Sequence, residues 1–202
     1  MIIITGTGRS GTSYMAKLLD HLGKDVLGSD IWMKDKKSGY ENDVIMPAFN
    51  EYSKGNIEES KKAIGKITNC DVFKTPQFVN RDNPEIIKLF NEHYDDLTVI
   101  VMYRDFKSVA KSFINYKIIP GVDSKHSRLF EKSEVGGLEK IVEKRYNNFI
   151  KVLDDEEIKY KHINYTKMIN EEEYALVKLS EIFPNMESDK IKKVYNEITI
   201  KK

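Results

Sequence analysis

The chain has 202 residues, of which 40% are hydrophobic and 32% are charged, and its formal net charge is +1. This balance is typical of a water-soluble globular domain, and it excludes a global positive field that would recruit nucleic acid or an anionic membrane. The length suits a single domain over residues 1–202. Because Cys70 is the one cysteine, no intramolecular disulfide can form, and no apolar run approaches the roughly 20 residues of a membrane helix. We therefore expect a cytoplasmic protein without a membrane span.

The beginning of the chain predicts a phosphate-binding element. An apolar run, Ile2–Thr5, predicts a strand, an amphipathic segment, Thr12–Leu22, predicts a helix, and the residues between them are rich in glycine. This arrangement cradles phosphate groups because a flexible backbone lets several amides converge on one anion, and the helix N-terminus adds unpaired N–H groups. Arg9 adds a charged donor fork. The candidate anion-binding residues are Gly8, Arg9, Ser10, Gly11, Thr12 and Ser13.

The glycine spacing is that of a Walker A loop with one departure. Gly6 and Gly11 fit the two glycines and Ser13 fits the final hydroxyl residue, but Thr12 occupies the position of the lysine. That lysine reaches the β- and γ-phosphates in enzymes that act on nucleoside triphosphates, so its absence argues against ordinary ATP chemistry. The pattern favours a different anion in a P-loop NTPase-like cradle. The alternative interpretation is a glycine-rich turn without a ligand.

Strands and helices alternate along the chain, which predicts a three-layer α/β/α fold with a central parallel sheet. The expected strands are Ile2–Thr5, Asp71–Thr75, Thr98–Tyr103 and Lys159–Asn164. The expected helices are Thr12–Leu22, Asp43–Tyr52, Ile57–Ile67, Pro84–Tyr94 with Asn83 as its cap, Phe106–Tyr116, Leu138–Leu153, Asn170–Phe183 and Asp189–Ile198. Ligands of such sheets bind at the carboxyl ends of the strands. The unassigned stretches Val26–Asn42 and Ile118–Gly137 are therefore either walls of an acceptor site or plain surface loops.

A second candidate anion site follows the third strand. Arg104 stands at the expected carboxyl end of this strand, and Ser112 lies eight positions further on, within the helix that begins at once. Ser108 and Ser112 are four residues apart and share one helix face. A charged fork and a hydroxyl on the same rim of the sheet make a candidate phosphate clamp. The alternative is a surface pair of Arg104 and Asp105 beside a serine-bearing helix.

The two candidate sites together resemble the sulfotransferase family. Its first motif, G-x-P-K/R-S-G-T-S/T, reads GTGRSGTS here at residues 6–13, and in the family it holds the 5′-phosphosulfate of 3′-phosphoadenosine 5′-phosphosulfate (PAPS). Its second motif, R-[DN]-P-x-[DS]-x-x-x-S, reads RDFKSVAKS here at residues 104–112, and in the family it holds the 3′-phosphate. The resemblance implies PAPS as co-substrate, adenosine 3′,5′-bisphosphate (PAP) as product, a hydroxyl or amine acceptor, and no metal.

A third stretch agrees with this resemblance. Residues 162–168, HINYTKM, are similar to the family's strand that ends in Tyr-Glu-Asp-Leu/Met, which implies that Tyr165 contacts the cofactor. The C-terminal region lacks the Arg-Lys-Gly sequence that adds 3′-phosphate contacts in cytosolic members. Lys192 and Lys193 are candidates to replace it; the alternative is that they belong to a solvated helix face.

Catalysis of sulfuryl transfer requires groups that position the reactants, neutralise charge and accept a proton. Arg9 is a candidate stabiliser of the leaving group, and Lys74 is a candidate donor to the sulfuryl oxygens. The family's histidine base after the second strand is absent, because the sequence reads Lys-Thr-Pro-Gln at residues 74–77. Glu41 is the first candidate base, since it resembles a Gly-aromatic-Glu element of some bacterial sulfotransferases, and Asp30 is the second. The alternative for Glu41 is a favourable charge at a helix N-terminus.

Two other functions stay open at this point. One is a P-loop nucleotide or small-molecule kinase, against which Thr12 argues and for which Asp105 is a candidate magnesium ligand. The other is a non-catalytic nucleotide-binding module. The expected partners are a nucleotide co-substrate and an acceptor that the sequence does not name, and the oligomeric state is open as well.

Overall fold

The computed structural model describes residues 1–27, 45–67, 70–80, 83–115 and 135–199. Four strands within these ranges form one parallel sheet in the order β2-β1-β3-β4. Their bounds are β1 Ile2–Gly6, β2 Val72–Lys74, β3 Thr98–Tyr103 and β4 Tyr160–Asn164. All four lie where the sequence predicts them, because each contains β-branched or aromatic residues that bury on a pleated surface.

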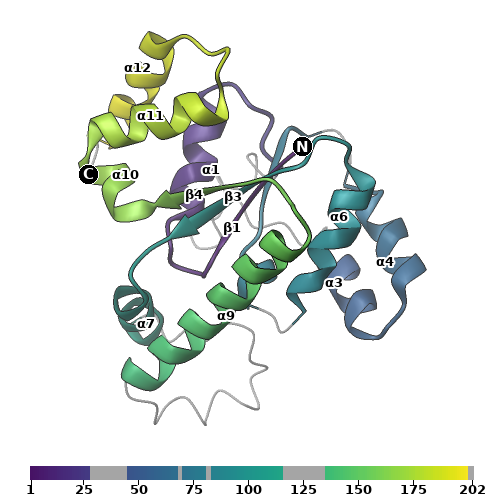
Figure 1. Ribbon diagram of the computed structural model, residues 1–202. Coiled ribbons are helices and arrows are strands. Elements are labelled where there is room, and N and C mark those ends of the chain that lie inside the picture. The colour runs from purple at the N-terminus through teal and green to yellow at the C-terminus, as the bar shows by residue number, and fades with distance from the viewer. Residues whose placement is uncertain (28–44, 68–69, 81–82, 116–134, 200–202) are drawn as a thin grey trace.

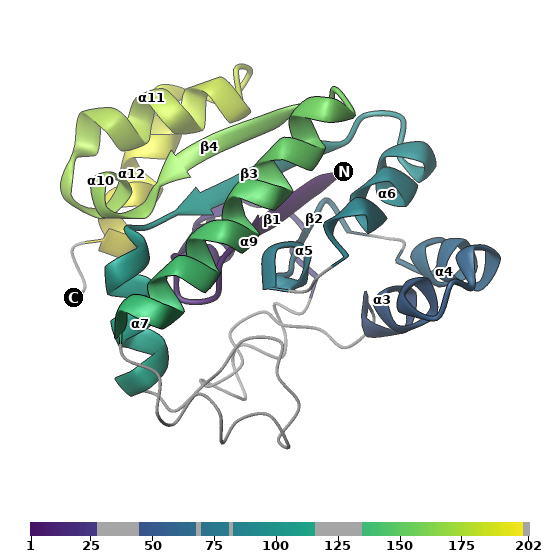
Figure 2. The ribbon, with the colours of Figure 1, turned by 60° about the horizontal axis from the view of Figure 1, so that its bottom comes forward.

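Helices cover both faces of the sheet, so the predicted three-layer α/β/α fold is confirmed (Figures 1 and 2). Side chains alternate along each strand: Ile3 and Val101 pack into one core with α3, α6 and α9, whereas Ile4 and Ile100 pack into the other with α1, α11 and α12. The helices of the first layer are α3 Met46–Ser53, α4 Ile57–Ile64, α5 Gln77–Asn80, α6 Ile87–His93 and α9 Val135–Asp155. Those beside the opposite face are α1 Thr12–His21, α10 Tyr165–Asn170, α11 Glu172–Ile182 and α12 Ser188–Thr199.

The strand register brings all four carboxyl ends to one edge of the sheet. Ile4 pairs with Lys74, Gly6 with Met102, and Tyr103 with Asn164. The glycine-rich loop, Thr75, Arg104 and Tyr165 each follow one of these strand ends directly. Helix α7, Phe106–Asn115, begins at the same edge (Figure 2). The sheet therefore brings the three sequence motifs to one edge, although they lie far apart in the sequence.

Three short elements differ from the sequence prediction. Helix α5, a single turn after β2, and helix α10, Tyr165–Asn170, are not predicted. The predicted helix at 84–94 begins as a 3₁₀ turn, Pro84–Ile86, before α6. Asn83 makes no capping hydrogen bond; its Nδ2 donates instead to Ser53 Oγ over 2.9 Å. Asn83 therefore occupies the predicted N-cap position, but its side chain bonds to α3 and not to the N–H groups of the helix it precedes.

The end of the last helix packs against the first one. Tyr14 Oη on α1 and Thr199 Oγ1 on α12 lie 2.7 Å apart, and burial raises the pKa of Tyr14 to about 12. The Tyr14 ring meets the ring of Tyr165 edge to face, with centroids 5.9 Å apart. Helix α12 thus contacts Tyr14, whose ring packs against Tyr165 next to the glycine-rich loop. No helix in the described ranges is long and apolar enough to cross a membrane.

Candidate functional site

The loop after β1 bends sharply into α1. The Ser10 N–H donates to the Thr7 carbonyl over 3.1 Å, and Arg9 has a φ of 68°, in the left-handed region. Gly11, with a φ of 96°, is the N-cap of α1 and accepts from Met15 N–H over 3.1 Å. The first N–H groups of α1 therefore have no helical partners and carry the positive end of the helix dipole. This is the geometry of an anion cradle.

Gly6 and Gly11 cannot be replaced freely, because their backbone conformation disfavours a Cβ and the space around them is too small for one. A methyl group on Gly6 would lie 2.4 Å from the Met102 carbonyl oxygen, and one on Gly11 would lie 2.1 Å from Cδ2 of Tyr165. Both residues also have positive φ, which side chains with a Cβ adopt at a cost. The ring of Tyr165 thus lies directly on the loop backbone at the start of α1.

We predict that Gly11→Ala lowers the free energy of unfolding by about 2–4 kcal/mol, from backbone strain together with overpacking against the Tyr165 ring. Gly55→Ala is the matched control, because Gly55 has a φ of 80° but no atom within 4 Å of an added Cβ; it should cost only about 1 kcal/mol. Urea unfolding measures both. A second substitution, Tyr165→Ala, should restore the stability that Gly11→Ala loses through overpacking, and it should restore none in Gly55→Ala. Equal losses of stability in the two glycine variants would contradict this account.

Arg104 meets the loop from the end of β3. Its Nη1 donates to the carbonyl oxygen of Arg9 over 3.4 Å, and its guanidinium carbon lies 5.7 Å from the centroid of the Tyr165 ring. In turn, Arg9 Nε donates to Ser112 Oγ over 3.1 Å. Residues of the first two motifs, 95 and 103 positions apart in sequence, are therefore direct neighbours, and Tyr165 of the third motif lies beside them. Two guanidiniums and a serine hydroxyl border the same loop.

The side chain of Asp105 has a different hydrogen-bond partner from that of Arg104. Its carboxylate accepts from the N–H of Ser108 over 2.9 Å at the start of α7. Hydrogen bonds from the side chain and backbone of Ser108 hold the pKa of this carboxyl below its usual range. Asp105 is therefore a helix cap, while Arg104 turns to the loop. The positive charge of Arg104 also lowers the pKa of Asp105, so the two side chains still interact electrostatically.

Lys74 reaches the loop from β2. It is only 3% exposed, and its Nζ donates to Ser13 Oγ in the first turn of α1 over 3.2 Å. Its side chain leaves the sheet on the face that α1 covers, because it alternates with Phe73, which points into the opposite core. An ammonium group is thus present beside the start of α1, although Thr12 replaces the lysine of the Walker pattern.

Two further features of the loop concern Gly8 and Ser10. The N–H of Gly8 donates to Asn80 Oδ1 on α5 over 3.3 Å, so this amide is directed at a side chain. The Ser10 hydroxyl is buried, and within the described part of the chain it has no hydrogen-bond partner.

The sequence does not identify Asn80 as a residue of the site, because it does not predict the short helix that carries Asn80. The proline after β2 and the apolar pair Phe78-Val79 were the available signals.

Two solved structures match almost the whole chain. A sulfotransferase domain from the curacin biosynthetic pathway has a TM-score of 0.55 and 15% sequence identity, over 95% of this chain and 76% of that one. A sulfotransferase domain from the Synechococcus PCC 7002 olefin synthase has a TM-score of 0.56 and 13% identity, over 95% of this chain and 75% of that one. The chain has the sulfotransferase fold. Neither a protein-family model nor a curated protein sequence matches it. The resemblance seen in the motifs is thus confirmed at the level of the fold.

The remaining predicted residues fall into two groups. Glu41 and Asp30, the candidate bases, lie outside the described residues of this sulfotransferase fold. Lys192, a candidate for the 3′-phosphate, lies on α12 with its Nζ 3.4 Å from a carboxylate oxygen of Glu172 on α11. This ion pair favours the alternative of a solvated helix face. Across the described residues, no group of three or more acidic, histidine or cysteine side chains is placed to hold a metal ion.

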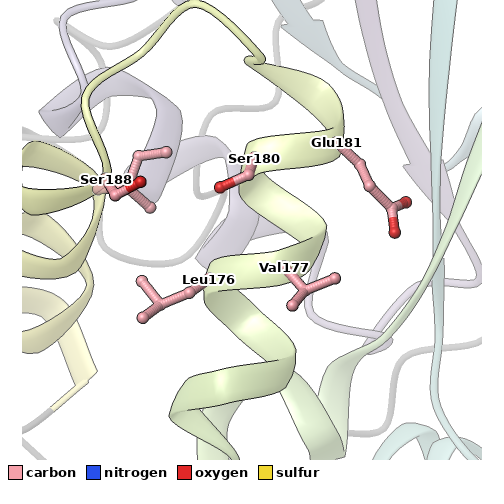
Figure 3. Close-up of a pocket in the computed structure, with 6 residues that line it drawn as sticks. Leu176, Val177, Ser180, Glu181 and Ser188 are labelled. Carbon is pink, nitrogen blue, oxygen red and sulfur yellow. The ribbon is translucent and has the colours of Figure 1, made fainter.

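A separate surface hollow of about 510 Å³ lies between α11 and α12 (Figure 3). It is lined by Leu176, Val177, Ser180, Glu181, Ser188 and Ile191. None of these six residues belongs to the three motifs. The hollow is therefore distinct from the loop site of the sulfotransferase fold, which is built from charged and hydroxyl side chains.

Proposed function

We propose that the protein is a sulfotransferase that moves a sulfuryl group from PAPS to a hydroxyl or amine acceptor. The observation that carries this proposal is the direct contact between the two anion motifs: Arg9 bonds to Ser112, and Arg104 bonds to the Arg9 carbonyl. PAPS is anionic at both ends of its ribose, and two adjoining sets of cationic donors suit it. A nucleotide with phosphate at the 5′ position alone would leave the donors of Arg104 and Ser112 without an anion.

The side chains present fit this ligand by their chemistry. Arg9, Arg104 and Lys74 supply cationic donors, and Ser13 and Ser112 supply hydroxyls. We assign the 5′ end to the loop and the N-terminus of α1, and the 3′-phosphate to Arg104 and Ser112. Tyr165, whose ring lies on Gly11 and beside Arg104, is assigned to the adenosine.

In the proposed reaction the bond between sulfur and the bridging phosphate oxygen breaks, and a new bond forms between sulfur and the acceptor oxygen or nitrogen. Arg9, Thr12, Ser13 and the α1 amides stabilise the charge that the departing phosphate gains. Lys74 donates to the sulfuryl oxygens. The acceptor loses its proton to a base, for which Glu41, with Asp30 second, stays the prediction.

Calorimetric titration with PAP, 5′-AMP, 3′-AMP and magnesium ATP tests the proposal. We expect PAP to bind most tightly, because it alone of the four carries both the 5′- and the 3′-phosphate. Binding that is indifferent to the 3′-phosphate would count against a sulfotransferase, and magnesium-dependent ATP turnover would favour a kinase. Tight PAP binding without transfer to any acceptor in a library of alcohols, phenols, sugars and amines would favour a non-catalytic module.

A further inference from the structure

The anion-binding loop contains a backbone conformation that its own sequence does not favour. Arg9 has a φ of 68°, and residues with a Cβ adopt this left-handed region at a cost that neighbouring contacts must offset. One contact that stabilises this conformation comes from Arg104, which donates to the Arg9 carbonyl oxygen. This hydrogen bond is long, at 3.4 Å, and it fixes only the C-terminal side of the Gly8-Arg9 pair.

Asn80 holds the other side of the same pair. Its Oδ1 accepts from the Gly8 N–H over 3.3 Å, and the residue is only 8% exposed. Gly8 itself lies between two helices: a methyl group there would be 3.0 Å from the Phe113 ring on α7 and 3.4 Å from Asn80 Nδ2 on α5. The loop backbone is thus seated between Phe113 and Asn80, with one directed hydrogen bond.

Helix α5 gives Asn80 a rigid base. The Asn80 N–H donates to the Pro76 carbonyl over 2.9 Å. Phe78, two residues earlier, is fully buried, and its ring contacts those of Phe49 and Phe90 at centroid distances of 5.1 and 5.2 Å. Because this aromatic cluster anchors α5 at the carboxyl end of β2 (Figure 2), the amide of Asn80 is placed by the core of the protein.

We propose that Asn80 is a positioning residue that fixes the anion-binding loop in its binding conformation before the nucleotide arrives. A loop that is already in place loses less conformational freedom on binding, and its donors stay aligned during transfer. Asn80 acts through Gly8 and needs no contact with the nucleotide. The identity of the anion rests on the proposed function; the hydrogen bond from Gly8 to Asn80 does not.

The test uses Asn80→Ala and Asn80→Asp in the full chain. The exchange of the Gly8 amide with water, measured by NMR in the ligand-free protein, should speed up at least tenfold in Asn80→Ala and stay slow in Asn80→Asp, which keeps an acceptor oxygen. Calorimetry should show about tenfold weaker PAP binding in Asn80→Ala, a loss typical of one hydrogen bond, with 3′-AMP unchanged. Asn83→Ala is the matched control, because Asn83 bonds to Ser53 and not to the loop.

The two readouts separate the possible failures. Unchanged exchange of the Gly8 amide in Asn80→Ala would overturn the positioning role whatever the ligand. Equal losses for PAP and 3′-AMP would also overturn it, because they would indicate a general disturbance of the fold, which thermal unfolding of both variants would reveal. If the unaltered protein binds neither nucleotide, the proposed function fails, and the amide exchange still decides whether Asn80 holds the loop.

Discussion

Arg104→Ala is expected to weaken PAP binding by about 100-fold, because a hydrogen-bonded charge pair with a phosphate is worth about 1.5–3 kcal/mol and each 1.4 kcal/mol is tenfold. The affinity for 5′-AMP should fall by less than about fivefold, since the remaining loss is that of one long hydrogen bond from the guanidinium to a backbone carbonyl. In the structure that bond runs from Arg104 to the Arg9 carbonyl. Calorimetry at one fixed ionic strength measures both affinities.

Two controls make this prediction specific. Lys107→Ala removes one positive charge from an exposed position in the first turn of α7, so it should reproduce any loss that comes from net charge alone. Arg104→Lys keeps the charge but not the planar fork, so it should recover only part of the affinity for PAP. Equal losses of PAP and 5′-AMP in Arg104→Ala would refute the assignment of Arg104 to the 3′-phosphate.

The strands and the layers could be predicted from sequence because the signal is local. Runs such as Ile2–Thr5 and Thr98–Tyr103 are apolar and β-branched, and the helical patterns between strands require parallel neighbours. The carboxyl-end rule then placed the glycine-rich loop and Arg104 on one edge. The structure agrees and shows how close they are: the two motifs are joined by hydrogen bonds between Arg9 and Ser112 and between Arg104 and Arg9.

The contacts that were missed depend on side chains that no periodicity connects. Asn80 is 72 positions from Gly8, and it stands on a helix of one turn, too short to show a repeating pattern. Gly8 illustrates the same limit: its φ is not positive, so the packing of Phe113 and Asn80 against it, and not backbone freedom, explains the glycine. Such requirements exist only once the neighbouring helices are in place.

Lys74→Met is expected to lower the rate of sulfuryl transfer by about 10²–10³-fold, the usual loss when one well-placed donor to a reacting group is removed. Lys74 is buried, and its Nζ lies 3.2 Å from Ser13 Oγ at the start of α1. The variant should bind PAP nearly as well as the unaltered protein, because PAP lacks the sulfuryl oxygens that this ammonium is proposed to contact. Conversion of PAPS to PAP under single-turnover conditions, with a small alcohol or amine as acceptor, gives the rate.

The choice of methionine separates chemistry from packing. Methionine fills a similar volume with a flexible apolar chain, and removing a buried ammonium releases its desolvation penalty, so the free energy of unfolding should not fall. Lys62→Met is the control, because Lys62 is exposed and pairs with Glu59 on α4. If PAP affinity fell by the same factor as the rate, Lys74 would be a ground-state binding group; if neither changed, its place beside Ser13 would be structural. Only a rate loss without an affinity loss fits an ammonium that acts on the transferred group, since that group is what distinguishes PAPS from PAP.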